Sequence, residues 1–150
     1  LPRTARGRPD PPPMRPANAS RLEHPMWQHG YLQAVEWRFV SGTFDQVGPA
    51  TVWARQRVPL VAGEEPTPLQ RLILLADSGN GLSRVLDLDG WWFINTDLTL
   101  HLHRQPVGEW MCVRARTFLD DQGSGMAETV LYDERGRLGR GAQALMVGPR

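Results

Sequence analysis

The apolar and polar positions of the chain follow first a strand pattern and then a helix pattern, and each pattern predicts a different element. Residues 31–40 and 51–61 have the composition of two strands, and residues 42–49 between them contain the glycine and proline residues of a turn. This part of the chain therefore predicts a β-hairpin.

A helix is predicted after the hairpin. Thr67 is a residue type that caps the start of a helix, and Pro68 suits the first helical position. Apolar side chains then recur at helical spacing, at Leu69, Leu72, Ile73 and Ala76. Gly79 and Gly81 weaken the helix toward its end, and Asp77 lies at the border of its apolar face. The pattern indicates one buried helix with a carboxylate at its edge.

The second half of the chain predicts an antiparallel meander. Residues 92–104 alternate with a period of two, which places Leu98, Leu100 and Leu102 on one face and their polar neighbours on the other. Loops and tight turns separate three further predicted strands, at residues 110–119, 126–132 and 138–147. A hairpin, a helix and a meander together predict an α+β domain whose antiparallel sheet wraps around one long central helix.

Length and composition divide the chain into a tail and one domain. Residues 1–22 are rich in proline and arginine and poor in apolar side chains, so we expect a disordered linker or tail. Residues 23–150 are long enough to bury one core of ordinary size. The chain opens at Leu1 in a stretch that resembles the middle of a longer sequence, so we expect a fragment of a larger protein.

Composition also argues against several classes of partner. The formal net charge is only +1, and no basic stripe suited to nucleic acid stands out. No apolar run approaches the roughly 18 residues that cross a bilayer, so we expect a soluble protein without a membrane partner. Cys112 is the single cysteine, which suits the reducing cytoplasm better than a secreted location.

Residues 93–110 carry the most specific motif of the chain. Their sequence, FINTDLTLHLHRQPVGEW, resembles the second-domain signature of the acyl-CoA thioesterase II family and its actinobacterial thioesterase-like relatives. Residues 75–77 in the predicted helix and residues 133–145 in the last turn and strand are similar to the same family. The resemblance spans residues 30–148 and implies a hotdog fold, as the C-terminal half of a double hotdog.

This resemblance implies hydrolysis of a fatty acyl-CoA thioester to a free acid and coenzyme A by an activated water, without a cofactor. Members use an aspartate on the helix, a threonine near the start of the central strand and a glutamine on the last strand. The matching residues are Asp77, then Asn95 or Thr96, and Gln143. Because a shift of one residue along a strand turns a side chain to the other face, Asn95 and Thr96 both stay candidates.

The same resemblance implies a second hotdog as a partner. The halves of double-hotdog proteins pack against each other, so we expect this domain either to pair with an N-terminal hotdog half or to form a homo-oligomer.

His101, His103 and Arg104 lie in the same strand motif. The spacing of the two histidines could serve zinc, but no further ligands lie close by in the sequence, so we expect no metal site. We predict that His103 and Arg104 help to hold the phosphates of coenzyme A, and a solvated position or a subunit contact are the alternatives.

Other classes of function fit the sequence less well. A hydratase on this fold places a histidine soon after the helix aspartate, and residues 78–83 contain none. A serine hydrolase of the Gly-x-Ser-x-Gly type is disfavoured because that motif does not occur in the chain. The remaining alternative is a non-catalytic hotdog domain that binds acyl-CoA or only stabilises a partner, and it is favoured if Asp77 or Gln143 points away from any pocket.

Overall fold

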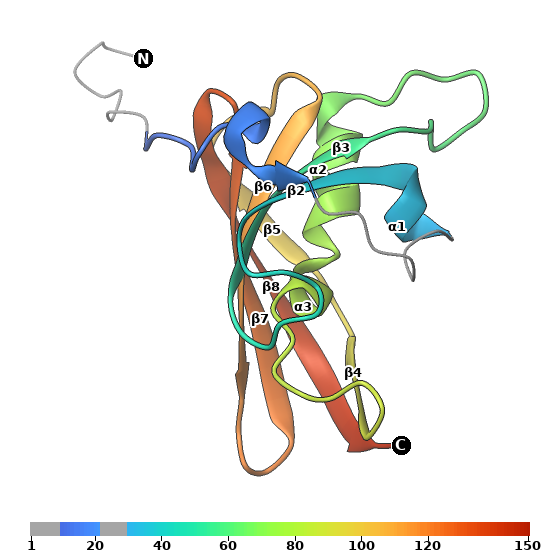
Figure 1. Ribbon diagram of the computed structural model, residues 1–150, viewed down its shortest axis with the longest axis vertical. Helices are drawn as coiled ribbons and strands as arrows, with labels where there is room; N and C mark the ends of the chain where they lie inside the picture. Colours follow the sequence, from blue (N-terminus) through green and yellow to red (C-terminus); the bar gives the residue numbers. More distant parts are fainter. Residues whose placement is uncertain (1–9, 22–29) are drawn as a thin grey trace.

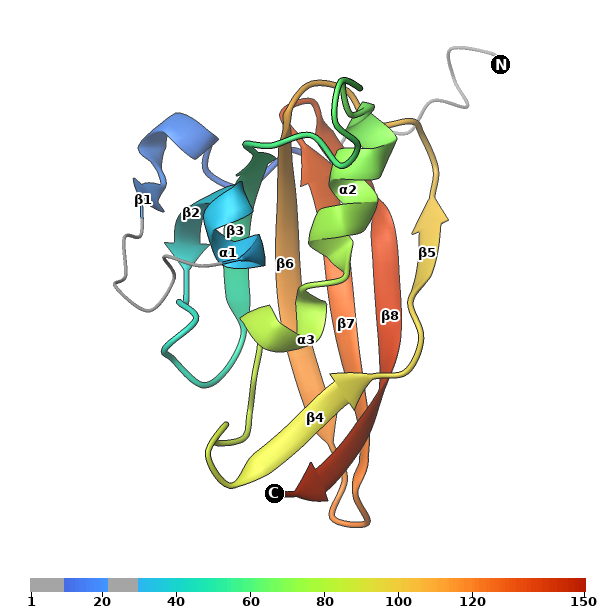
Figure 2. The same ribbon diagram turned by 90° about the vertical axis from the view of Figure 1, so that its right-hand side faces the viewer.

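A single antiparallel sheet curls around a short helical segment in the computed structural model, which describes residues 10–21 and 30–150 (Figures 1 and 2). The strands are β1 Ser20–Arg21, β2 Val35–Ser41, β3 Ala50–Gln56, β4 Trp91–Asn95, β5 Thr99–Leu102, β6 Trp110–Leu119, β7 Ser124–Asp133 and β8 Gly136–Pro149. Their order in the sheet is β1-β2-β3-β6-β7-β8-β4, and β5 also pairs with β8. The long strand β8 therefore holds both β4 and β5 at one edge.

The helical segment consists of α2 Pro68–Ala76 and α3 Gly79–Leu82, and a further short helix, α1 Tyr31–Ala34, precedes β2. α2 begins where the sequence predicts, because the Thr67 side chain accepts a hydrogen bond from the Gln70 amide and the Gln70 side chain accepts one from the Thr67 amide. The predicted long helix is interrupted after Ala76, where Asp77 caps α2. No helix within the described residues has the length and apolar composition needed to cross a membrane.

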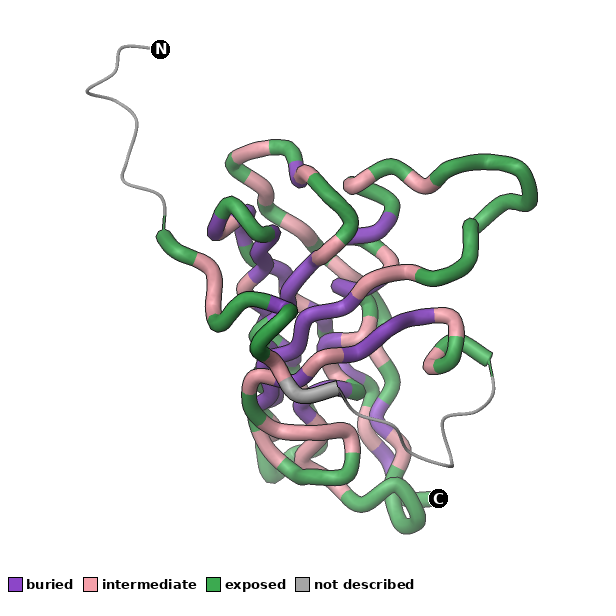
Figure 3. The backbone as a smooth tube through the Cα atoms, turned by 45° about the horizontal axis from the view of Figure 1, so that its top comes forward, coloured by how far each residue is buried: buried purple, intermediate pink, exposed green. Residues whose placement is uncertain are grey.

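The core lies between the helical segment and the concave face of the sheet. Leu72, Leu75 and Leu82 of the helices pack with buried side chains of the central strands, among them Val113 and Leu131. Figure 3 shows the buried positions concentrated along these strands. Because the helical segment packs on only this face, the opposite face of the sheet is left for other contacts.

Part of that opposite face is occupied by residues 10–21, which the sequence predicts to be a disordered tail. The Trp53 indole N–H donates to the Met14 carbonyl, the Arg38 guanidinium donates to the Pro16 carbonyl, and the Arg137 amide donates to the Asp10 carbonyl. These residues meet a small buried cluster on that face, formed by Trp53, Cys112 and Tyr132. Residues 10–21 are therefore packed on the sheet, while residues 1–9 and 22–29 lie outside the described part of the chain.

Three predicted strands differ from the structure in their extent. The stretch 51–61 ends as strand β3 at Gln56. The stretch 31–40 begins as α1, whose turn is held by a hydrogen bond from the Trp37 indole to the Leu32 carbonyl. The stretch 92–104 is two strands, β4 and β5. Between them the Asp97 carboxylate accepts a hydrogen bond from the Ala144 amide at 2.7 Å, so a side chain takes the place of a backbone partner and the ladder is interrupted.

Candidate active site

Asp77 lies exposed at the break between α2 and α3. Gln143 of β8 approaches this break from the sheet, and its side chain is fully buried. The Gln143 Nε2 group donates to the Asp77 carbonyl at 3.0 Å, and the Gln143 Oε1 atom accepts from the Asn80 amide at 3.1 Å. One side-chain amide therefore binds the end of α2 and the beginning of α3, which fixes the backbone of Asp77.

This contact requires a glycine at position 79. A Cβ atom on Gly79 would lie 2.7 Å from Gln143 Oε1 and 2.8 Å from the Thr129 methyl group, both too close for ordinary packing. The helical backbone thus approaches the sheet at Gly79 in a way that any larger residue would obstruct. The same glycine that weakens the predicted helix allows Gln143 to reach Asp77.

Asn95 joins Asp77 and Gln143 in a cluster and contacts the Asp77 carboxylate itself, whereas Gln143 contacts only the backbone of Asp77 and Asn80. Asn95 stands opposite Leu145 in the pairing of β4 with β8, and its Nδ2 group donates to Asp77 Oδ1 at 2.7 Å. Thr96, the alternative candidate, is exposed, and its hydroxyl donates to the Ala144 carbonyl at 3.3 Å. The structure therefore brings Asp77, Asn95 and Gln143 together and leaves Thr96 outside the cluster.

Tyr31 and Ser78 lie beside this cluster, and no local pattern in the sequence indicates that they are close together. The Tyr31 hydroxyl donates to the Leu74 carbonyl at 3.1 Å and lies 2.8 Å from Ser78 Oγ. Burial raises the pKa of Tyr31 to about 12, with a smaller opposing effect from the Ser78 hydrogen bond and a smaller supporting effect from the Asp77 charge. Tyr31 is thus a protonated hydrogen-bond donor at neutral pH.

An apolar groove runs along α2 and includes the candidate carboxylate. Its volume is about 580 Å³, and its lining residues are Tyr31, Leu60, Gln70, Ile73, Leu74, Asp77, Ser78 and Leu98. A mostly apolar groove with a few convergent polar groups is the usual form of a small-molecule site. Asp77 therefore faces a groove that can accept an apolar chain, whereas Asn95 and Gln143 do not line it. The buried position of Gln143 leaves the non-catalytic alternative open.

Arg104 follows β5 and lies against the first residues of β8, Gly136 and Arg137. Its guanidinium donates two hydrogen bonds of 2.6 Å to the carboxylate of Asp133, which is fully buried, and it also donates to the carbonyls of Gly136 and Arg137. This end of β8 and Gln143 are about 20 Å apart along the strand. The hydrogen bonds give Arg104 a structural role, and its role in substrate binding stays a prediction.

The two histidines of the strand motif are exposed. His101 belongs to β5, and the His103 amide donates to the Leu138 carbonyl just beyond that strand. Within residues 10–21 and 30–150, no three His, Cys, Asp or Glu side chains lie close enough to hold a metal ion. The predicted contact of His103 with phosphate stays a prediction.

Comparison with known proteins assigns the family. The family model described as the acyl-CoA thioesterase C-terminal domain matches residues 8–147. The chain belongs to this family. As an acyl-CoA thioesterase C-terminal domain it has the hotdog fold predicted from the sequence, and the match includes the strand motif and the three clustered side chains.

Solved structures support the fold of this acyl-CoA thioesterase C-terminal domain. A candidate thioesterase from Novosphingobium aromaticivorans DSM 12444 is 22% identical, with a TM-score of 0.65 over 94% of this chain and 55% of that chain. A candidate thioesterase II from Thermobifida fusca YX is 18% identical, with a TM-score of 0.67 over 99% of this chain and 56% of that chain. A hot dog fold protein from Alicyclobacillus acidocaldarius is 15% identical, with a TM-score of 0.66 over 99% of this chain and 57% of that chain.

The chain spans little more than half the length of each of these proteins. No protein in the curated collection matches the chain.

Proposed function

We propose that this domain hydrolyses acyl-CoA thioesters with Asp77 as the central catalytic residue. The observation that carries the proposal is the hydrogen bond from Asn95 Nδ2 to Asp77 Oδ1. The Asp77 carboxylate that accepts this bond also faces an apolar groove. The family of the chain supports a thioester as the substrate class. The groove supports an acyl chain, and its apolar lining favours a fatty one.

The proposed chemistry uses the two oxygens of the Asp77 carboxylate differently. Asn95 holds Oδ1, so Oδ2 is the oxygen left to accept a proton from water. The water oxygen attacks the thioester carbon, the carbon–sulfur bond then breaks, and the thiolate of coenzyme A takes up the proton. Gln143 acts as a positioning residue, because its amide binds backbone groups on both sides of Asp77 and is fully buried.

We further propose that a second hotdog completes the site. The groove beside Asp77 is open, and Leu60, Leu69 and Ile73 near it expose 52%, 37% and 45% of their surface. Exposed apolar side chains along one groove are typical of an interaction surface. The N-terminal half of a longer protein or a second copy of this domain would bury these side chains.

We also propose a reducing compartment such as the cytoplasm, which suits the free thiol of Cys112.

The test is thiol release from acyl-CoAs of several chain lengths by the intact protein. Asp77→Asn keeps the size of the side chain and removes its base, so we expect kcat to fall about 100-fold or more. Asp121→Asn is the matched control, because Asp121 is an exposed aspartate in the β6–β7 loop. Equal rates in Asp77→Asn and wild type would refute the catalytic role of Asp77.

The same experiment separates the enzyme from the non-catalytic alternative. If calorimetry shows that wild type binds an acyl-CoA but no thiol is released at any chain length, the domain binds its ligand without turnover. Release by wild type and not by Asp77→Asn, with unchanged binding in both, would support the proposal.

A further inference from the structure

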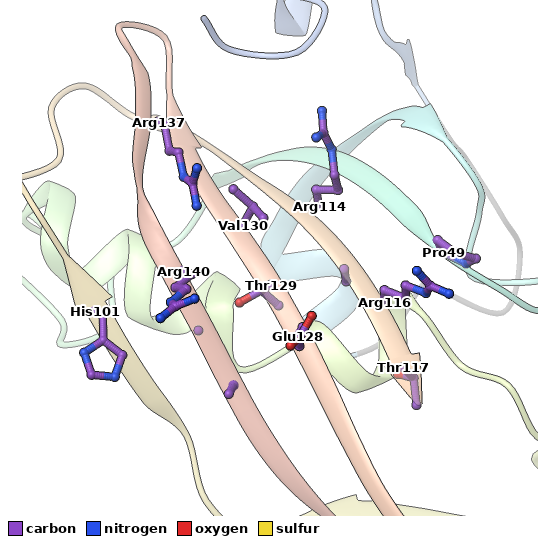
Figure 4. A pocket seen from close by; sticks show the side chains of 13 residues that line it. Pro49, His101, Arg114, Arg116, Thr117, Glu128, Thr129, Val130, Arg137 and Arg140 are labelled. Carbon is purple, nitrogen blue, oxygen red and sulfur yellow. The ribbon is translucent and has the colours of Figure 1, made fainter. Parts of the chain in front are cut away.

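The face of the sheet opposite α2 carries a second hollow, with a different chemical character from the groove. Its volume is about 990 Å³. Figure 4 shows the side chains that line it, which come from β5, β6, β7 and β8, with the helical segment behind the sheet. Its charged members are Arg114, Arg116, Glu128, Arg137 and Arg140, and His101 also lines it. Four arginines against one glutamate leave an excess of three positive charges.

The strand register explains why these charges share one face. Arg114 of β6 stands opposite Val130 of β7, Val130 stands opposite Arg140 of β8, and Arg140 stands opposite His101 of β5. Neighbouring strands are about 4.8 Å apart, so Arg114 and Arg140 begin about 10 Å from each other with a small residue between them. The row thus forms an apolar floor with a cationic side chain at each side.

Within the described residues, neither Arg114 nor Arg140 stands opposite an acidic residue in the sheet, whereas Arg116 stands opposite Glu128. Among the ion pairs of residues 10–21 and 30–150, none includes Arg114, Arg116 or Arg140. Arg137 is 3.8 Å from the Asp10 carboxylate, so its charge is partly balanced. Like charges repel each other, so a ligand that supplies negative charge would stabilise this face of the sheet.

Two of the guanidinium groups also lie over aromatic rings. Arg114 lies over the ring of Tyr132 at 5.6 Å, and Arg116 lies over the ring of Phe118 at 4.6 Å. Stacking engages the flat face of a guanidinium and leaves its N–H groups free along the edge. Ring contacts of this kind limit the motion of an exposed arginine, which lowers the entropy lost when an anion binds beside it.

We propose that this hollow binds a small organic anion that carries two or more phosphate groups on an apolar or aromatic body. Arginine recognises phosphate through paired hydrogen bonds, and the floor of Val130 and Ala142 suits an apolar body. A second copy of the chain across a twofold axis is disfavoured, because it would bring together two patches that both have a net positive charge. The hollow is separated from Asp77 by the thickness of the sheet, so the inference stands apart from the proposed hydrolysis.

The experiment is calorimetric titration of the intact protein at low salt with ADP and with adenosine. ADP has two phosphate groups on an aromatic body, and adenosine is the same body without charge. We expect ADP to bind at one site and adenosine not to bind. The double variant Arg114→Gln/Arg140→Gln should weaken ADP binding roughly tenfold or more, because each substitution removes a charge-assisted hydrogen bond to phosphate.

Arg57→Gln is the matched control, because Arg57 is an exposed arginine outside this hollow. It should bind ADP as wild type does, and circular dichroism should show all three proteins equally folded. Absence of ADP binding to wild type would overturn the proposal. Equal ADP affinity in wild type and the double variant would also overturn it, because ADP would then occupy another site, such as the groove beside Asp77.

Discussion

Replacing Arg104 by glutamine should destabilise the fold by about 3 kcal/mol. The carboxylate of Asp133 is fully buried and accepts two hydrogen bonds of 2.6 Å from Arg104. Removing one partner of a buried ion pair costs about 3–5 kcal/mol, because the other charge stays in the interior. The Arg104 side chain is 30% exposed, so water screens part of the interaction and the lower end of that range applies.

The destabilisation should depend on pH. Burial raises the pKa of Asp133, but the hydrogen bonds from Arg104 and from the amides of Val107 and Arg135 outweigh it, so its pKa lies below the usual value. A carboxyl with a lowered pKa stabilises the fold above its unfolded pKa of about 3.9, and this contribution is lost as pH falls through the folded pKa. The difference between wild type and Arg104→Gln should therefore be largest near neutral pH and narrow in acid.

Urea denaturation followed by circular dichroism at several pH values measures this difference. A loss of about 3 kcal/mol also corresponds to a melting temperature lower by about 10 °C for a domain of this size. Arg135→Gln is the control, since Arg135 is exposed in the adjacent turn. A cost below about 1 kcal/mol, which is typical of a surface pair, would refute the reasoning, and so would a difference that does not change with pH. A raised KM with unchanged stability would instead support substrate binding by Arg104.

Two further predictions concern the cluster around Asp77. Asn95→Ala should lower kcat for thiol release about 100-fold, and Thr96→Ala should lower it less than about tenfold. The reason is that, of these two residues, Asn95 contacts the Asp77 carboxylate and Thr96 does not. A larger loss of kcat in Thr96→Ala than in Asn95→Ala would contradict this. Gly79→Ala should destabilise the protein by about 1–3 kcal/mol and lower kcat, since its Cβ would displace Gln143. Thermal unfolding and thiol release test the second, and a Gly79→Ala protein with wild-type stability would show that the helix can move away from the sheet.

Local patterns in the sequence were sufficient for the start of α2 and for most of the sheet. The start of α2 can be predicted because the effects of Thr67 and Pro68 act within one turn of the helix. The predicted capping residue, Thr67, is the observed one. The alternation of Leu98, Leu100 and Leu102 likewise holds in the structure, where all three pack against the core. Such signals depend on neighbours in the sequence and can be interpreted without the fold.

Contacts between distant residues decide the rest of the candidate site. The choice between Asn95 and Thr96 depends on the register of β4 against β8, which places Asn95 beside Leu145, and no local pattern reports that register. The approach of Tyr31 to Ser78 joins residues that are 47 positions apart. The sequence identifies Gly79 only as a weak helix former, because its close contact with Gln143 forms only when the helix packs on the sheet.

The segment at residues 10–21 affects where this folding unit begins. Composition places the boundary at residue 23, yet the Trp53 indole finds its hydrogen-bond partner at Met14, and Ala19 packs against the cluster of Trp53, Cys112 and Tyr132. A recombinant fragment cut at the compositional boundary would leave the indole N–H without that acceptor and expose an aromatic surface to other molecules in solution. The proline-rich stretch therefore covers an apolar cluster on the outer face of the sheet and belongs to the folded domain. Any shortened form of the protein for crystallisation or assay should retain it.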